Sequence, residues 1–216
     1  MHAEHYYKVI YPIQDKVIQV FRDTPFYLTD GTALSRGYYN HRFSDDLDYF
    51  VNYLSNFHML AEVQVKKLQD IFPIVDVDYK GDYFYRLYVA ERQLKIEIVN
   101  DVPAHIGEKL NHPIIGIIDS RENILANKIT AIVDRCMPKD IADIYFLLKD
   151  GLSLKQALLD AHSKAAGIAP LYIAKIFSEY DYCLLDSEIR WIRPVASPNI
   201  AEYLREISMR IVRGSL

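Results

Sequence analysis

The sequence predicts an α+β fold in which a small mixed sheet flanked by helices is followed by a C-terminal helical bundle. Two observations lead to this prediction. Through the first half of the chain, β-branched and aromatic runs alternate with stretches of helical apolar spacing, whereas after about residue 119 the spacing is helical throughout. No repeat, low-complexity segment or long linker separates the halves. We therefore expect an α/β domain over residues 1–119 and a helical domain over residues 120–216.

The first elements of the chain are predicted to be a helix, a strand, a turn and a second helix. Apolar residues recur at helical spacing over residues 13–21, and Pro25 ends that helix. The run FYL (26–28) predicts a short strand. The Thr-Asp-Gly sequence at residues 29–31 supplies turn chemistry, and its threonine or aspartate can cap a helix in TALSRGYY (32–39).

The remaining strands are predicted from alternation. DLDYFV (46–51) alternates acidic and apolar residues, and a helix over residues 57–72 follows it. Three β-branched or aromatic runs, divided by two turn-forming segments, then predict a meander of strands. These strands are expected at residues 73–80, 83–90 and 94–99, and the segment 103–113 is expected to be a loop.

After residue 119 every segment with a clear apolar period is helical. The predicted helices of this half lie at residues 122–136, 138–148, 152–166, 170–177 and 198–212.

Composition places the chain among ordinary intracellular proteins. Its 216 residues can bury a real core, and a net charge of -4 argues against a surface coated in basic residues for bulk nucleic-acid binding. Cys136 and Cys183 are too few for a disulfide framework. The N-terminus lacks a signal-peptide pattern, and apolar stretches such as PIIGII are far shorter than a membrane span. We expect a cytoplasmic protein without a membrane partner.

The acidic strand carries the clearest chemical signal. Asp46 and Asp48 share one of its faces while Leu47 points to the core, because successive side chains alternate. Two such carboxylates need a cation to stay ionised together, and Mg²⁺ bound by carboxylates plus substrate phosphates meets that need. Glu97 in LKIEIV is the predicted third ligand, so that the site can hold two Mg²⁺. The alternative is the solvated polar face of a half-buried strand.

The turn before that strand predicts a phosphate site. Free backbone N–H groups at Gly31 and Thr32, where a helix opens, can cradle phosphates. With Mg²⁺ on the following strand they would form a site for a nucleoside triphosphate. Ser44, just before the acidic pair, is a candidate to cap the strand or to touch a phosphate.

Two cations lie on the first predicted helix of the second half. Lys128 and Arg135 are seven residues apart and therefore project from one helix face. On spacing alone they can be ordinary solvated helix cations. Asp140 and Asp143 follow Pro138 in the next helix, where acidic residues also complement the helix dipole.

A resemblance to a known family rests on the run DGTALSRGYYNHRFSDDLDYF. It resembles the nucleotidyltransferase signature of the AbiEii/AbiGii toxin family, within the DNA polymerase β-like superfamily. That signature has a Gly-Gly-Thr/Ser-Ala-Leu turn and then an Arg-x-Ser-x-Asp-Ile/Leu-Asp strand. Here the strand element reads Arg42-x-Ser44-x-Asp46-Leu47-Asp48, and Asp30 replaces the first glycine of the turn.

A second family element lies in the helical half. It consists of a helix lysine, a following arginine and a basic-Asp pair, which Lys128, Arg135 and Lys139-Asp140 match. The resemblance therefore covers roughly residues 20–150 and contains both elements in order.

The resemblance implies a polymerase β-like nucleotidyltransferase that moves a nucleoside monophosphate from an NTP to an acceptor. Its catalytic residues would be Asp46, Asp48, Lys128 and Asp140, the last positioning Lys128 or assisting the acceptor. The resemblance also implies that Lys128 and Arg135 contact the triphosphate, and it makes Ser44 a candidate nucleophile. The implied setting is the toxin of a toxin–antitoxin or phage-defence system, with tRNA or another RNA as acceptor and a cognate antitoxin as partner. The alternatives are a small-molecule or protein nucleotidyltransferase, and a degenerate binding module without turnover, which Asp30 favours.

Overall fold

The chain divides into two compact units. The computed structural model describes residues 2–165 and 167–216. Unit 1 comprises Met1–Tyr38 and Phe43–Asp119, and unit 2 comprises Tyr39–Arg42 and Ser120–Leu216. The short segment Tyr39–Arg42 thus belongs to the second unit although the chain on both sides of it belongs to the first.

Unit 1 is built on a mixed seven-stranded sheet in the order β3-β4-β5-β2-β1-β7-β6. β2 pairs in parallel with β5, and β1 in parallel with β7, while the other neighbours are antiparallel. The strands are β1 (Tyr27–Thr29), β2 (Asp46–Asn52), β3 (Val75–Lys80), β4 (Phe84–Val89), β5 (Leu94–Asp101), β6 (Leu110–His112) and β7 (Gly116–Ile118).

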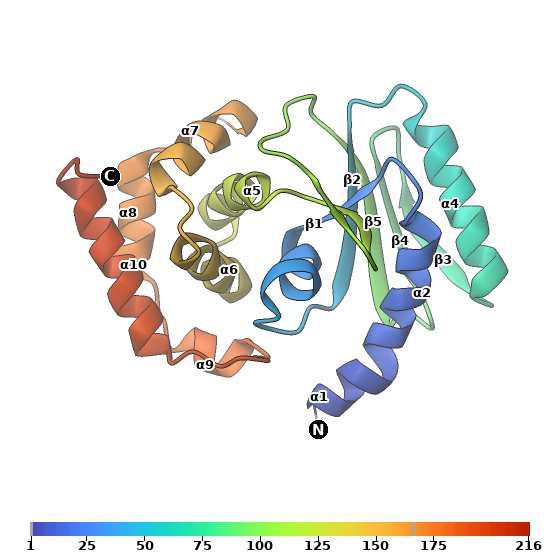
Figure 1. Ribbon diagram of the computed structural model, residues 1–216, viewed down its shortest axis with the longest axis horizontal. Helices are drawn as coiled ribbons and strands as arrows, with labels where there is room; N and C mark the ends of the chain where they lie inside the picture. The colour runs from blue at the N-terminus through green and yellow to red at the C-terminus, as the bar shows by residue number, and fades with distance from the viewer. Residues whose placement is uncertain (1, 166) are drawn as a thin grey trace. The chain divides into compact units, whose positions relative to one another are not determined.

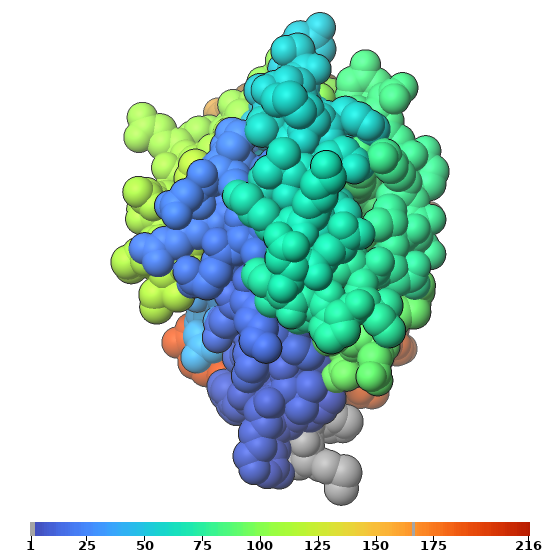
Figure 2. Space-filling view, turned by 90° about the vertical axis from the view of Figure 1, so that its right-hand side faces the viewer, coloured from blue at the N-terminus to red at the C-terminus, as the bar shows by residue number. Residues whose placement is uncertain are grey.

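One face of this sheet is covered by helices. Phe21 of α2 stacks on Tyr49 of β2 with ring centroids 3.9 Å apart, and Phe57 of α4 meets Tyr85 of β4 edge to face. Figure 1 shows α2 and α4 beside the sheet, and Figure 2 shows them side by side at the surface, in blue and teal. The helical segments of unit 1 are α1 (His2–His5), η1 (Tyr6–Ile10), α2 (Tyr11–Phe21), α3 (Asp30–Thr32), η2 (Ala33–Tyr39) and α4 (Phe57–Ile71), of which η1 and η2 are π-helical.

The alternation along β2 places its apolar side chains on one face of the sheet and its two aspartates on the other. Leu47, Tyr49 and Val51 are buried, with at most 6% of each residue exposed. They pack toward the helix-covered face because apolar burial drives the sheet and its helices together. Asp46 and Asp48 consequently lie on the opposite face.

Unit 2 is a helical bundle. α5 packs against α6, α7 and α8, and α10 packs against α6 and α8. Its helices are α5 (Arg121–Asp134), α6 (Pro138–Lys149), α7 (Leu154–Lys164), α8 (Pro170–Glu179), α9 (Leu184–Glu188) and α10 (Ser197–Val212). No helix among the described residues is both long and apolar enough to span a membrane.

The α+β prediction and its longer elements are confirmed. The meander of three strands is present, and three residues with positive φ turn the chain between its second and third strands: Ala90, Glu91 and Arg92. The prediction of a loop over residues 103–113 is wrong at residues 110–112, where β6 pairs with β7. β7 and α9 also lie outside the predicted elements. Residue 166, the last of one predicted helix, lies outside the described residues.

Candidate active site

The register of β2 and β5 brings four charged side chains onto one face of the sheet. Asp46 lies opposite Lys95, and Asp48 lies opposite Glu97. Since the two strands are parallel and in register, these side chains point the same way, and we call the four residues the acid face. The side chains of Asp46 and Glu97 are 29% and 17% exposed, so this is not the freely solvated surface of the alternative prediction.

The carboxylates of the acid face are unequally neutralised. Lys95 Nζ lies 3.3 Å from Asp46 Oδ2 and 3.4 Å from Glu97 Oε1. Arg86 Nε donates to Glu97 Oε1 at 2.8 Å. Among the described residues Asp48 forms no ion pair, and Asp46, Asp48 and Glu97 do not bring one oxygen each within 4.8 Å of one another. The three predicted metal ligands therefore share a face without forming a closed cluster.

The ionised form of Asp48 is disfavoured on the acid face. Burial, together with the negative charges of Asp30, Asp46 and Glu97, raises the pKa of Asp48 to about 8. Burial opposes the charge on Lys95, but the surrounding carboxylates outweigh it and raise the pKa of that ammonium. A hard divalent cation held by carboxylate oxygens would relieve the repulsion at Asp48, so the donor set fits Mg²⁺.

The turn before η2 is braced against β2 by hydroxyl groups. Thr32 donates its hydroxyl proton to the carbonyl of Asp46 at 2.5 Å, and the hydroxyls of Thr32 and Ser44 share a hydrogen bond of 2.8 Å. Gln14 donates to the carbonyl of Ser44 at 2.9 Å. The predicted phosphate residues Thr32 and Ser44 therefore lie together, directly beside the first acidic residue of β2.

The position at which Asp30 replaces the family glycine has a left-handed backbone. Asp30 has φ 55°, a region that glycine adopts freely and aspartate tolerates. It follows Thr29, whose Cα pairs with that of Asp48. The negative charge of its carboxylate acts on Asp48 and helps to raise the pKa of Asp48, which a glycine would not do.

In unit 2, Lys128 is held by two buried carboxylates. Its Nζ lies 2.8 Å from Asp140 Oδ1 and 2.9 Å from Asp143 Oδ2. Asp140 also accepts from Arg135 Nε at 3.0 Å. Lys128 is only 1% exposed, whereas the Arg135 side chain is 45% exposed. Lys128 is thus no solvated helix cation, and both predicted cations turn toward Asp140.

Asp143 joins Lys128 to the signature arginine. Arg42 donates from Nε and Nη2 to the two oxygens of Asp143, at 2.8 and 2.7 Å. His41 Nε2 lies 2.9 Å from Asp143 Oδ1. We call His41, Arg42, Lys128, Arg135, Asp140 and Asp143 the ion cluster.

The protonation states of Asp143 and His41 follow from burial and from the other charges of the ion cluster. Burial works against the charged form of Asp143, but Arg42 and Lys128 outweigh it and hold the pKa of Asp143 well below its usual range. Burial lowers the pKa of His41. A neutral His41 donates from Nε2 to Asp143, which agrees with the absence of a described hydrogen-bond partner at Nδ1.

Sequence reasoning passed over Lys95 and Asp143 as site residues. Lys95 had a usable signal, since it lies two residues before Glu97 and alternation puts both on one face. Asp143 lies three residues after Asp140 and so on the same side of α6. Its partners Arg42 and His41 are about 100 residues away in sequence, and no local pattern predicts that pairing.

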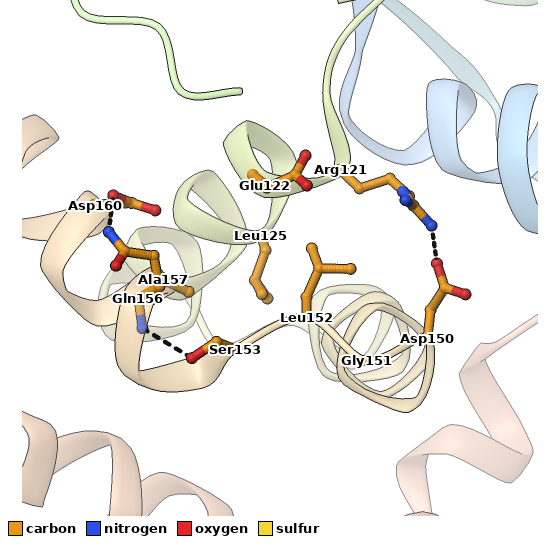
Figure 3. A pocket seen from close by; sticks show the side chains of 10 residues that line it. All are labelled: Arg121, Glu122, Leu125, Asp150, Gly151, Leu152, Ser153, Gln156, Ala157 and Asp160. Atoms are coloured by element: carbon orange, nitrogen blue, oxygen red, sulfur yellow. Dashed lines mark hydrogen bonds and ion pairs between the residues drawn. The ribbon is translucent and has the colours of Figure 1, made fainter. Parts of the chain in front are cut away.

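Two hollows of the surface are separate from these residues. One, of about 350 Å³, lies in unit 2 between the start of α5, the loop after α6 and α7, and the ion pair of Arg121 with Asp150 closes one side of it (Figure 3). The other, of about 370 Å³, lies in unit 1 around Tyr53, His58 and Asn100. None of the predicted site residues lines either hollow.

Comparison with known proteins decides the family. The model of the nucleotidyl transferase AbiEii toxin family, a Type IV toxin–antitoxin system, matches residues 15–202. The chain belongs to this family. It is therefore a nucleotidyltransferase, and the resemblance noted in the sequence is confirmed. Membership of a toxin–antitoxin family implies an antitoxin partner, and nucleotidyl transfer implies an NTP substrate and, typically, a divalent metal.

Solved structures support the polymerase β-like fold of this AbiEii member. JHP933 from Helicobacter pylori is 20% identical with a TM-score of 0.65, over 95% of this chain and 91% of that one. A candidate nucleotidyltransferase from H. pylori is also 20% identical with a TM-score of 0.66, over 95% and 94%. The antibiotic-resistance factor ANT(2'')-Ia is 16% identical with a TM-score of 0.51, over 73% and 91%. A search of curated proteins found no match.

Proposed function

We propose that this AbiEii-family enzyme transfers a nucleoside monophosphate from an NTP to an RNA acceptor, with a divalent cation on the acid face. The observation that supports this most is the placement of Asp46 and Asp48 on one sheet face directly beside the Thr32–Ser44 hydrogen bond. The acceptor hydroxyl would attack the α-phosphate of the NTP and release pyrophosphate.

Each residue of unit 1 has a role in this proposal. Asp46 and Asp48 would hold Mg²⁺, with Glu97 as a further ligand for the predicted second ion. The bound metal would neutralise charge that develops on the phosphates in the transition state. The backbone at Gly31 and Thr32 would hold the phosphates, with the Ser44 hydroxyl beside them.

The ion cluster supplies the residues of the second family element. Lys128 and Arg135 are the proposed phosphate contacts, and Arg135 has the geometry for a bidentate contact. For Asp140 we favour the positioning role over direct help to the acceptor, because it accepts from both cations.

The proposed biological role is that of a cytoplasmic toxin in a toxin–antitoxin or phage-defence pair. tRNA is the proposed acceptor among RNAs, and a neighbouring antitoxin the proposed partner. Small molecules or proteins are the alternative acceptors. A degenerate module that binds a nucleotide or a partner without turnover is the alternative to an enzyme.

The experiment incubates the protein with each labelled NTP, Mg²⁺ and total RNA, and compares the wild type with Asp46→Ala and Lys128→Ala. Label transfer to RNA that both substitutions abolish is the expected result. Transfer to protein or to small molecules alone would replace RNA as the acceptor. No transfer to any acceptor, with equal nucleotide binding by all three proteins, would leave only a binding module.

The toxin role is tested separately from the chemistry. Expression of the wild type without an antitoxin is expected to stop growth, and expression of Asp46→Ala is expected to leave growth unchanged. Normal growth with active wild-type enzyme would refute the toxin role while leaving nucleotidyl transfer in place.

A further inference from the structure

Lys95 occupies a special place on the acid face because it contacts two of the three proposed metal ligands. Its Nζ is 3.3 Å from Asp46 and 3.4 Å from Glu97, and it is the one described cation within 4 Å of Asp46. Glu97 has a second cation in Arg86, at 2.8 Å. Asp48 has no ion-pair partner among the described residues. The protein thus neutralises one side of the acid face and leaves Asp48 on the other.

The sheet holds Lys95 in this place. Its Cα is opposite that of Asp46 in the parallel pairing of β2 and β5, and Glu97 is two residues further along the same strand. The Lys95 side chain is 27% exposed, and Leu94 and Ile96 on either side of it are buried in the core. The backbone of β5 is therefore anchored, and the ammonium stays within reach of both carboxylates.

We propose that Lys95 serves as a built-in second cation, so that the nucleotide-free protein binds one divalent ion on Asp46 and Asp48 instead of two. This inference rests on the proposed metal site. Paired metal ions in such enzymes lie about 3.5–4 Å apart and share carboxylate ligands. A second ion here would need Glu97, which Lys95 and Arg86 already hold, and would have to displace the Lys95 ammonium. Lys95 is in this sense a positioning residue that sets the number of ions.

The test counts bound ions directly. Mn²⁺ is titrated into the full-length, nucleotide-free protein, and free Mn²⁺ is measured by electron paramagnetic resonance. The wild type is expected to bind one ion with high affinity. Lys95→Met keeps the length of the side chain but removes its charge, and it is expected to bind a second ion or to bind the first at least 10-fold more tightly.

Two matched variants separate position from charge. Lys95→Arg keeps the charge and is expected to bind one ion like the wild type. Lys80→Met removes a lysine that pairs with Glu62 elsewhere in unit 1, and it is expected to leave Mn²⁺ binding unchanged. Lys95→Gln provides a second neutral variant if Lys95→Met does not fold, as judged by circular dichroism.

The outcomes distinguish this inference from the metal site on which it rests. Two ions bound by the wild type, or identical Mn²⁺ binding by the wild type and the neutral Lys95 variants, would overturn the role of Lys95. No Mn²⁺ binding by any variant, or binding that Asp48→Asn does not weaken, would overturn the metal site itself. Nucleotidyl transfer by the same wild-type preparation shows whether the enzyme activity survives either failure.

Discussion

The acid face of unit 1 and the ion cluster of unit 2 contain the same kinds of side chain in opposite balance. In the ion cluster, Asp140 and Asp143 receive three cations, Arg42, Lys128 and Arg135. On the acid face, Asp48 has no ion pair among the described residues and its pKa is raised to about 8. Removing a buried carboxylate that the protein neutralises leaves its partner cations uncompensated, whereas a carboxylate without an ion pair can bind a ligand cation.

The largest expected effect tests the balanced side of this comparison. Asp143→Asn leaves Arg42 and Lys128 without their shared buried carboxylate, so we expect the free energy of unfolding to fall by about 3–5 kcal/mol. Urea denaturation monitored by circular dichroism measures this change. Glu202→Ala, on the exposed side of α10, is the control and should stay within about 0.5 kcal/mol of the wild type. A loss below about 1 kcal/mol for Asp143→Asn would mean that the cluster does not depend on its charge balance.

The pH dependence of stability tests the protonation state of His41 in the ion cluster, with a smaller expected effect. His41 faces Asp143, Arg42, Lys128 and the Tyr39 ring, and its pKa is lowered by burial. In the unfolded chain His41 has a pKa of about 6.5. Below that pH the unfolded chain binds a proton at His41 that the folded protein does not bind, so the free energy of unfolding falls as pH falls. We expect a loss of about 1 kcal/mol between pH 6.5 and 5.5 from this residue.

The measurement compares urea denaturation at several pH values in wild type and His41→Gln. Glutamine can donate to Asp143 as the neutral imidazole does, but it does not titrate. The difference between the two proteins should shrink as pH falls below 6.5, since only the wild type loses stability through this residue. Parallel pH profiles for the two proteins would show that His41 is not held neutral.

Much of the acid face could be predicted from local sequence. Alternation along DLDYFV is enough to put Asp46 and Asp48 on one face, and the same rule selects Glu97. The register that sets Lys95 opposite Asp46 could not be predicted from local sequence, because it depends on the pairing of two strands almost 50 residues apart. Local alternation thus predicted the ligands, while long-range pairing determined which of them are neutralised.

The ion cluster and the short strands could not be predicted in the same way. β6 and β7 have only three residues each, and their pairing partners, rather than a period of their own, make them strands. His41 and Arg42 belong to unit 2 through Asp143, although they lie next to the sequence of unit 1. A two-residue contact of this kind leaves no periodic signal in the sequence.

Asp48→Asn tests the unbalanced side of the comparison and is expected to have the opposite sign from Asp143→Asn. In the absence of metal, burial and the charges of Asp30, Asp46 and Glu97 penalise the ionised form of Asp48 in the folded protein but not in the unfolded chain. The neutral amide removes this penalty, so we expect the free energy of unfolding to rise by about 1 kcal/mol. Denaturation at pH 7.5 with EDTA present measures it. A loss of stability would mean that a partner within the folded protein stabilises Asp48 and that it does not need a bound cation.

Arg135→Ala has the smallest expected effect on folding and therefore separates function from stability most cleanly. Its side chain is 45% exposed, and Asp140 keeps Lys128 as a partner, so the free energy of unfolding should fall by less than about 1 kcal/mol. If Arg135 contacts the triphosphate, kcat/KM for the NTP should still fall by at least about 10-fold, since charge-assisted contacts contribute about 1.5–3 kcal/mol. Arg135→Lys, which keeps the charge without the bidentate geometry, should lie between. Unchanged kcat/KM in a stably folded Arg135→Ala protein would reduce this arginine to a surface ion pair and leave Lys128 as the cation of the second family element.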